Sequence, residues 1–320
     1  MKEVYVKTLD GWSLSVRHYE PRKRSQSLPV VLCHGFAASG RGFELGHVTI
    51  VNFLVDRGYD VFVVDLRGHG GSKHDRGMKD WSFSEYVEID APLLVKYACE
   101  ATNAERAHWV GHSMGGIIGL GLAIDDPDVP LASLSTIGSS LDYSASGSDW
   151  TMFQPLFPLV KRLSSVPIGG LARLESRLLP VLQTPFSILN VWPGNSDHAL
   201  WRSVCREVFS DTSSGVVAQL TSGIEPGGLR SVRDPSQRYM AAANVIKVPT
   251  MIVTGDRDKQ CPPAAARRTF DVVGTGDKEL VIFGKGRGDH HHYGHFDLVI
   301  GRHAESEVFP ALERWMSAHA

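Results

Sequence analysis

The sequence predicts an α/β fold, in which helices flank a mostly parallel β-sheet. Residues 29–35 (PVVLCHG) and 60–68 (DVFVVDLRG) are short apolar runs rich in β-branched residues, and neither run alternates with polar residues. Such runs are typical of strands buried on both faces of a parallel sheet. Helical spacing fills the stretches between these runs, so strands and helices alternate in right-handed βαβ units.

The chain is expected to begin with a β-hairpin. Polar and apolar residues alternate over residues 3–21, around the dipeptide Asp10-Gly11. This dipeptide favours the positive φ angles of a tight hairpin turn. The hairpin therefore precedes the first buried strand.

The next elements follow in regular alternation. Residues 83–101 have helical spacing and lead to a strand within residues 106–113 (RAHWVGHS). Another helix begins after Ser113 (MGGIIGLGLAIDD), and the following strand covers residues 130–138. This order predicts two consecutive βα units.

The same alternation returns near the C-terminus. It comprises a strand (248–258), a helix (262–273), a strand (278–286) and a final helix from His295 onward. We therefore expect one α/β core domain formed by two parts of the chain, residues 1–138 and residues 237–320.

Residues 139–236 differ from both flanking parts, because their apolar residues have helical rather than strand spacing. We interpret them as a helical lid or cap, here called the insertion. The alternative, that these apolar stripes belong to the core of one continuous domain, stays open, because helices bury apolar faces in any domain. The stripes are Trp150, Phe153, Phe157 and Val160, followed by Leu171, Leu174, Leu178 and Val181.

Composition narrows the classes of function. The formal net charge is −2, which gives no basic field for binding nucleic acid. No run approaches the roughly 18 apolar residues needed to span a bilayer, and the N-terminus is not typical of a signal peptide. The four cysteines are widely spaced, as in reduced cytosolic proteins. We expect a cytoplasmic protein without stable membrane insertion, and the sequence predicts no oligomeric state.

The motif GxSxG occurs at Gly111, Ser113 and Gly115. It follows the predicted strand AHWV and begins a helix rich in small residues, which is the strand-turn-helix setting of a nucleophile elbow. Such a turn strains the serine backbone and exposes its Oγ, and side chains at the two flanking glycines would collide with neighbouring backbone. Ser113 is therefore the candidate nucleophile. The alternative is a glycine-rich junction with a passive serine.

At these motifs the chain resembles the α/β-hydrolase superfamily, and the resemblance covers nearly everything outside the insertion. HGF (34–36), DLRGHGGS (65–72), GHSMGG (111–116) and GHF (294–296) occur in the order that this superfamily uses. The segments DRGYDVFVVDLRGHG and YGHFDLVIG are most similar to bacterial esterases and lipases related to the acid lipases. Serine at position 113 disfavours polyester synthases, dehalogenases and epoxide hydrolases, which have cysteine or aspartate there.

A serine nucleophile needs a base, and that base needs a carboxylate to hold its tautomer. The resemblance implies that the acid is the third residue after the strand-ending Gly255, which is Asp258. Asp256 is the alternative, and we expect it to cap the turn or face solvent. The order of acid before histidine follows the same superfamily.

The stretch GDHHHYGHFD (288–297) contains four histidines. The resemblance places the base in a GHF context between the last strand and the last helix, which selects His295. A metal site formed by His290, His291, His292 and His295 is the alternative, but consecutive residues in a loop seldom converge on one ion. We expect no metal and no cofactor, and we expect His290–His292 to lie in an exposed loop.

Backbone amides are expected to stabilise the oxyanion that forms in the reaction. One is the amide of Met114, directly after the nucleophile. The resemblance implies that the other is the amide of Phe36. We expect His34, Gly35 and His112 to support these loops.

The predicted function is that of a serine carboxylesterase or lipase that forms an acyl-enzyme. We expect a small ester with an apolar acyl chain as substrate, bound by Trp150, Phe153 and Phe157, with Trp192 and Trp201 as further candidates. A thioesterase or a lactone or amide hydrolase would use the same residues. The alternative from another class is an inactive hydrolase fold that binds an apolar ligand.

Overall fold

The computed structural model describes the chain except residues 47, 161 and 179–183, and the side chains of residues 153, 156, 158 and 178. In this part of the chain one sheet has nine strands, in the order β1-β2-β4-β3-β6-β7-β10-β11, with β5 also paired to β2. The strands are β1 (Lys2–Lys7), β2 (Trp12–Tyr19), β3 (Val30–Cys33), β4 (Val61–Val64), β5 (Lys73–His74), β6 (Ala107–His112), β7 (Leu131–Ile137), β10 (Thr250–Gly255) and β11 (Lys278–Phe283).

The predicted fold class is confirmed. From β4 to β11 all neighbouring strands are parallel, whereas β1, β2 and β4 pair antiparallel. The turn between β1 and β2 contains Gly11 with a φ of 95°, as expected for the N-terminal hairpin.

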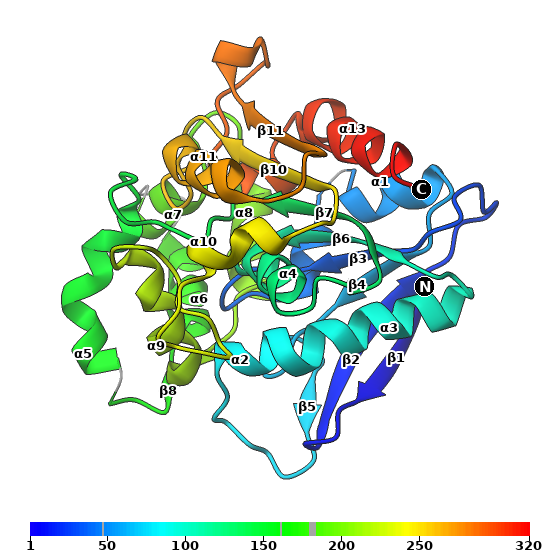
Figure 1. Cartoon of the computed structure of the whole chain (residues 1–320). Coiled ribbons are helices and arrows are strands. Elements are labelled where there is room, and N and C mark those ends of the chain that lie inside the picture. Colours follow the sequence, from blue (N-terminus) through cyan, green and yellow to red (C-terminus); the bar gives the residue numbers. More distant parts are fainter. Residues whose placement is uncertain (47, 161, 179–183) are drawn as a thin grey trace.

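Helices cover both faces of the sheet (Figure 1). One face packs against α3 (Ala91–Thr102), α4 (Met114–Asp125), α10 (Tyr239–Ala242) and α11 (Pro263–Val272). The other packs against α1 (Ile50–Asp56), α12 (Asp297–Ile300) and α13 (Ala304–Ser317). This three-layer arrangement buries both faces of the central strands.

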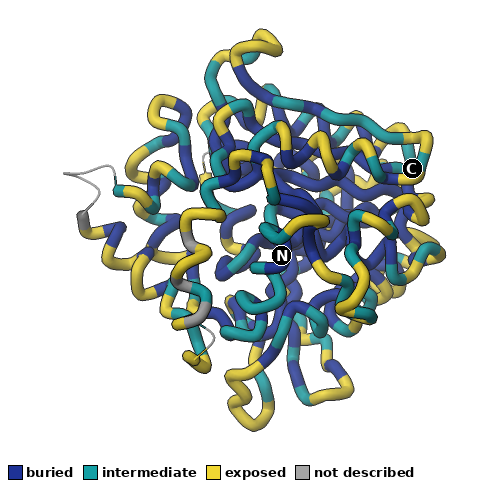
Figure 2. Tube along the Cα trace, turned by 60° about the vertical axis from the view of Figure 1, so that its left-hand side comes forward, coloured by how far each residue is buried: buried dark blue, intermediate teal, exposed yellow. Residues whose placement is uncertain are grey.

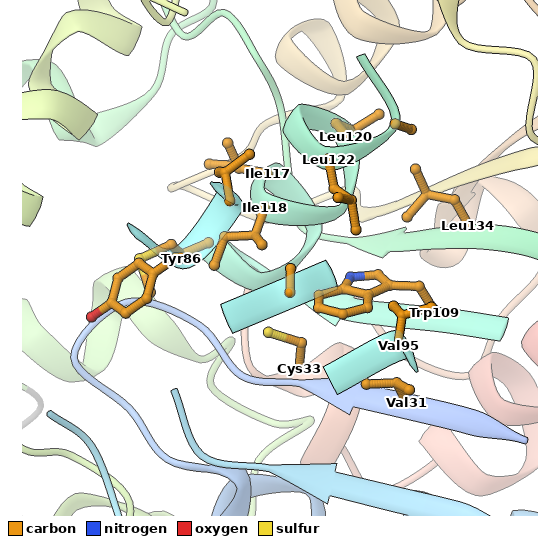
Figure 3. Packing of buried hydrophobic residues seen from close by; sticks show 14 of the residues in the cluster. Val31, Cys33, Tyr86, Val95, Trp109, Ile117, Ile118, Leu120, Leu122 and Leu134 are labelled. Carbon is orange, nitrogen blue, oxygen red and sulfur yellow. The ribbon is translucent and has the colours of Figure 1, made fainter. Parts of the chain in front are cut away.

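The residues of β3 show why its sequence lacks polar alternation. Val31 and Cys33 belong to the apolar cluster under α3 and α4, whereas Val30 and Leu32 belong to the cluster under α1 and α13. Figure 3 shows the first cluster, in which Trp109 of β6 lies near β3 and α4. Because successive side chains point to opposite faces, every residue of such a strand must be apolar.

Some elements are shorter than the sequence predicts. The helix expected over residues 83–101 consists of α2 (Phe83–Glu85), a π-helical turn (Tyr86–Asp90) and α3. The C-terminal helix begins as α12 and is interrupted before α13. Such interruptions leave the helical periodicity of the sequence nearly unchanged, so periodicity alone did not indicate them.

In its described part the insertion contains several short helices and a two-stranded ladder. Its elements are the 3₁₀-helix η3 (Asp149–Leu156), α5 (Phe157–Val160), β8 (Ser165–Val166), α6 (Ile168–Leu178), α7 (Pro185–Asn190), α8 (His198–Glu207), β9 (Thr212–Ser213), α9 (Ser214–Leu220) and the 3₁₀-helix η4 (Thr221–Ile224). The strands β8 and β9 pair antiparallel. The sequence did not indicate them because each has only two residues.

The apolar stripe of α6 faces outward rather than inward. Leu171 is 56% exposed and Leu174 is 52% exposed, whereas Ala172, Glu175 and Ser176 are buried against the neighbouring helices. Figure 2 shows exposed stretches along this side of the molecule. Leu171 and Leu174 therefore do not belong to a core face. Val181, which the sequence placed in the same stripe, lies outside the described residues.

No described helix is long and apolar enough to cross a membrane. The four cysteines are all buried free thiols.

Candidate active site

Ser113 lies between β6 and α4, at the carboxyl end of the sheet. Its φ of 53° and ψ of −120° lie in a region that residues with a side chain rarely adopt. Such strain persists only where the surrounding structure enforces it, and it is typical of functional sites. The strand-turn-helix geometry thus matches the elbow that the GxSxG motif predicts.

Three glycines allow the chain to pack this closely around Ser113. A Cβ on Gly111 would lie 2.3 Å from the backbone of Gly115, and a Cβ on Gly115 would lie 2.2 Å from the carbonyl oxygen of Cys33. A Cβ on Gly35 would lie 2.9 Å from Cβ of Ser113. The loop after β3 therefore packs directly on the elbow.

Asp258 and His295 form a buried pair. Their side chains are 0% and 2% exposed, and His295 Nδ1 lies 2.8 Å from Asp258 Oδ2. The other carboxylate oxygen of Asp258 accepts the backbone amides of Gln260 (2.9 Å) and Cys261 (2.8 Å). The carboxylate is thus fixed on both sides, and it favours the tautomer that carries the proton on Nδ1.

Asp256 holds a different histidine. Its Oδ2 lies 2.5 Å from Nδ1 of His292, and its Oδ1 accepts the amide of Tyr293 at 3.1 Å. Asp256 therefore does more than cap a turn or face solvent, which is what the sequence predicts for it. It is Asp258, not Asp256, that contacts His295.

The end of β7 connects Ser113 to the Asp258–His295 pair. The amide of Ser113 donates to the carbonyl of Ile137 (2.7 Å), and the hydroxyl of Ser139 donates to the carbonyl of Ser113 (2.7 Å). Between them, a Cβ on Gly138 would lie 2.9 Å from Nδ1 of His295. This segment therefore lies between the serine and the acid–histidine pair.

Sequence analysis missed the role of residues 137–139. The signal was present as the sequence IGSS at the end of a predicted strand, because the carboxyl ends of neighbouring parallel strands meet at one edge of the sheet. Gly138 has a φ of 64°, which explains a glycine at that point.

The serine hydroxyl and the imidazole are not hydrogen-bonded in the described part of the structure. His295 is nonetheless tied to the elbow through His112, whose ring lies 4.8 Å from that of His295 and whose Nε2 donates to the carbonyl of His295 at 3.3 Å. In unliganded hydrolases the hydrogen bond between nucleophile and base is often long and tightens with substrate.

His34 and His112 are both buried. The amide of Leu66 donates to Nε2 of His34 at 3.0 Å, and Nδ1 of His34 lies 2.9 Å from the carbonyl of Gly35. Burial lowers the pKa of His34, and it lowers the pKa of His112 well below the usual range. Both rings can therefore stay uncharged hydrogen-bonding braces for the loops around Ser113.

The backbone amides of Met114 and Phe36 are the candidates for stabilising an oxyanion. The amide of Met114 lies at the N-terminus of α4, where the helix dipole favours negative charge. Among the described residues, neither this amide nor that of Phe36 donates a hydrogen bond to another part of the chain. Both residues line the same pocket as Ser113, so both amides are candidates for binding an anionic oxygen.

The remaining histidines of the loop have partners other than Ser113 and Asp258. Nδ1 of His290 lies 2.6 Å from Glu307, and the rings of His290 and His291 stack on that of His303. Within the described residues no three His, Cys, Asp or Glu side chains are arranged to hold a metal ion.

The comparisons with known proteins give the family. A family model described as "Serine aminopeptidase, S33" (Hydrolase_4) matches residues 25–292, which is most of the chain. The chain belongs to this family. The match ends before His295, so the partner of Asp258 is known from the geometry alone.

Relatives of this S33-family hydrolase include lipases. Gastric triacylglycerol lipase of Rattus norvegicus is 33% identical over 132 residues, covering 37% of this chain and 33% of the lipase. Human lysosomal acid lipase/cholesteryl ester hydrolase is 29% identical over 132 residues, with the same coverage of 37% and 33%. The chain thus spans about a third of the length of these curated relatives.

Solved structures share the fold over nearly the whole length. The monoacylglycerol lipase of Paleococcus ferrophilus has a TM-score of 0.63 at 22% identity, covering 96% of this chain and 99% of that one. An esterase from Exiguobacterium antarcticum has a TM-score of 0.63 at 17% identity, covering 99% and 100%. At these identities the similarity establishes the α/β-hydrolase fold of the family member.

An apolar pocket of about 620 Å³, including its open mouth, lies beside Ser113 of this hydrolase. The rings of Phe36 and Trp150 meet edge to face there, 5.8 Å apart, and Phe157 also lines the pocket. The side chain of Phe153 lies outside the described part of the structure. Two of the three predicted substrate-binding residues therefore line a pocket that also contains the serine.

Trp192 and Trp201 do not line this pocket, so that expectation is wrong. Trp201 is 1% exposed and packs between Phe186, Phe209 and Phe296 in the opposite apolar cluster. The ring of Trp192 lies beside His292 and Arg257.

Much of the pocket wall comes from residues that the sequence did not single out. They are Ile117, Ser140, Tyr143, Val217, Leu220, Thr221, Gly223, Ile224 and Leu229. Five of them lie late in the insertion, in α9 and η4. The run VVAQL was a possible signal, but its spacing does not show which way a helix faces.

Proposed function

We propose that this chain is a carboxylic ester hydrolase that forms an acyl-enzyme on Ser113. The observation that carries the proposal is that a buried Asp258–His295 pair and a strained serine at the wall of an apolar pocket both contact the end of β7. His295 takes the proton of the serine hydroxyl and passes it to the leaving alkoxide. It then removes a proton from the water that attacks the acyl group.

The amides of Phe36 and Met114 bind the oxyanion in this proposal. Removal of one such donor typically costs on the order of 100-fold in rate. The acyl chain lies along the pocket wall, against Phe36, Trp150 and Phe157 on one side and α9 and η4 on the other. An apolar wall with few polar groups favours aliphatic acyl chains.

Peptidase activity at a free N-terminus is the second candidate, because the family description names a serine aminopeptidase. Such a substrate carries a charged ammonium group, which needs a carboxylate when it is desolvated. The described residues that line the pocket include no Asp or Glu. The pocket thus supports an uncharged ester better than an N-terminal peptide.

A fluorophosphonate probe tests the proposal. The wild type is expected to be labelled, and Ser113→Ala is expected to remain unlabelled and to lose p-nitrophenyl ester hydrolysis. Absence of labelling in the wild type, or equal labelling of both proteins, would instead support an inactive fold that binds an apolar ligand. Aminoacyl p-nitroanilides in the same assay distinguish peptidase from esterase activity, and acyl thioesters and lactones test the related bonds.

A further inference from the structure

Asp297 is a buried acid that the proposed reaction does not use. It lies two residues after His295 and is 0% exposed. Its Oδ2 accepts the backbone amides of Trp192 (2.6 Å) and Gly294 (2.8 Å). Its Oδ1 is buried and has no hydrogen-bond partner among the described residues. Burying a carboxylate without a cationic partner costs free energy, so the buried position of Asp297 needs a structural reason.

The two amides come from different parts of the chain. Gly294 directly precedes His295, whereas Trp192 belongs to a segment of the insertion, residues 190–192, here called the strap. On the other side of His295, the amide of Phe296 donates to the carbonyl of Asn190 at 2.7 Å. The strap therefore holds the backbone on both sides of the imidazole.

The strap also reaches the acid. The side-chain oxygen of Asn190 accepts Nε2 of Gln260 at 2.9 Å, and the amide of Gln260 donates to Oδ1 of Asp258 at 2.9 Å. Asn190 and Gln260 are only 4% and 6% exposed, so water competes little for these bonds. One short segment is thus hydrogen-bonded to the loops of both Asp258 and His295.

Close packing at Gly294 shows how tightly the strap and the histidine loop meet. A Cβ on Gly294 would lie 2.7 Å from the amide nitrogen of Trp192 and 2.9 Å from Oδ2 of Asp297. Real Cβ atoms do not come this close, so any side chain at this position would push the strap away.

Capping of its own helix does not explain Asp297. The helix α12 has only four residues, and the carboxylate bonds lead to residues 192 and 294, which precede this helix. Burial raises the pKa of Asp297 to about 7, the charge of Asp258 adds to this rise, and the two amides oppose it. The acid is therefore neutral in mildly acidic solution and becomes charged near pH 7.

We propose that Asp297 is a positioning residue that fixes the imidazole of His295 by joining the amide of Gly294 to the strap. The inference rests on the proposed esterase function. In this proposal the strap keeps His295 and Asp258 in place relative to each other. Other parts of the insertion form the wall around the substrate.

A pair of substitutions of nearly equal shape tests the proposal. Asp297→Asn keeps an oxygen that can accept both amides, whereas Asp297→Leu has a similar branched shape but no acceptor. We expect Asp297→Leu to lower kcat and the rate of fluorophosphonate labelling on the order of 100-fold with KM within about threefold, because small misplacements of a base have that effect. Asp297→Asn should retain activity within about threefold of wild type. Equal losses in both variants, or wild-type labelling of Asp297→Leu, would overturn the proposal.

A second pair covers the case in which Asp297→Leu fails to fold. Gly294→Ala should lower kcat because its Cβ displaces the strap, whereas a Cβ on Gly286 meets no atom within 4 Å, so Gly286→Ala is the matched control. A wild-type kcat in Gly294→Ala would contradict the proposal that the strap positions His295.

Hydrogen exchange separates this inference from the esterase proposal. Asp297→Leu, or Gly294→Ala in its place, should speed exchange at the amides of Trp192 and Gly294, and this readout needs no activity. If the probe does not label the wild type, the esterase proposal fails. Unchanged exchange at these two amides would refute only the proposal that Asp297 joins Gly294 to the strap.

Discussion

Asp256 and Asp258 are two residues apart in the loop after β10, and each carboxylate holds a different histidine. The side chain of Asp258 is 0% exposed, whereas that of Asp256 is 23% exposed. A buried carboxylate that accepts two amides and an imidazole can hold one tautomer in place.

The two aspartates are expected to differ sharply in function. Asp258→Asn should lower kcat on the order of 10⁴-fold, because the amide favours the wrong tautomer of His295. Asp256→Asn should stay within about tenfold of wild type, since its partner His292 is not among the described residues that line the pocket. The measurement is steady-state hydrolysis of a p-nitrophenyl ester at fixed pH. A larger loss in Asp256→Asn would show that the acid was assigned to the wrong residue.

Asp297 is expected to make stability depend on pH. Its pKa rises from 3.8 to about 7 on folding, chiefly through burial, so the folded state favours the protonated acid. The resulting stability is complete below pH 3.8 and is lost as the pH rises through about 7, with a total on the order of 4 kcal/mol.

Urea unfolding of wild type and Asp297→Asn between pH 4 and 8 measures this effect. The difference in unfolding free energy between them should change in favour of the variant as the pH rises, because Asn cannot ionise. A difference that is constant with pH would show that Asp297 does not titrate on its own.

At the scale of the element, the end of the insertion forms part of the pocket wall. In α9 and η4, Val217, Leu220 and Ile224 contact the same pocket as Ser113, while the exposed leucines of α6 face solvent. Both α6 and α9 contain apolar residues. Because α6 packs on α8, its leucines face outward.

Enlarging one wall residue should shorten the accepted acyl chain. Ile224→Trp is expected to lower kcat/KM for long-chain p-nitrophenyl esters by about 10- to 200-fold while sparing the acetate, since each methylene in a pocket contributes within that range. Leu174→Trp, at a position that is 52% exposed, is the control and should leave the chain-length profile unchanged. Equal losses on short and long esters would mean that Ile224 does not bound the acyl site.

At the scale of the whole molecule, the insertion shares its apolar contacts with the sheet. Trp201 and Val204 of α8 belong to the cluster that contains α1 and α13, and Val216 of α9 belongs to the cluster that contains α3 and α4. Elements that share a core unfold together in small proteins. We therefore expect the insertion and the sheet to lose structure in one transition.

Calorimetry of a core variant tests this cooperativity. Trp201→Ala removes a side chain that is 1% exposed, and it should destabilise the protein by about 3–5 kcal/mol and shift the single thermal transition downward. Leu174→Ala, at an exposed site, should change the transition little. Two separate transitions, of which only the lower one moves in Trp201→Ala, would show that the insertion unfolds by itself.

The sequence by itself determined the fold class and indicated the nucleophile elbow, whereas the choice of Asp258 and His295 came from the resemblance to the superfamily. Buried parallel strands must be apolar at every residue, and an elbow needs glycines at fixed positions beside the serine, so both features appear in local patterns. Local patterns do not show which way a helical stripe faces, because Leu171 and Leu174 have the spacing of a core face and yet are exposed to solvent.

Only the tertiary structure decided what connects these local features. The segment from Ile137 to Ser139 lies between the serine and the acid–histidine pair, and the strap from residue 190 joins the two catalytic loops through backbone amides and carbonyls. Every residue type except proline carries the same amide, so such contacts leave almost no trace in side-chain patterns. Asp297 was visible as a residue, but its role depends on two amides that the fold brings to it.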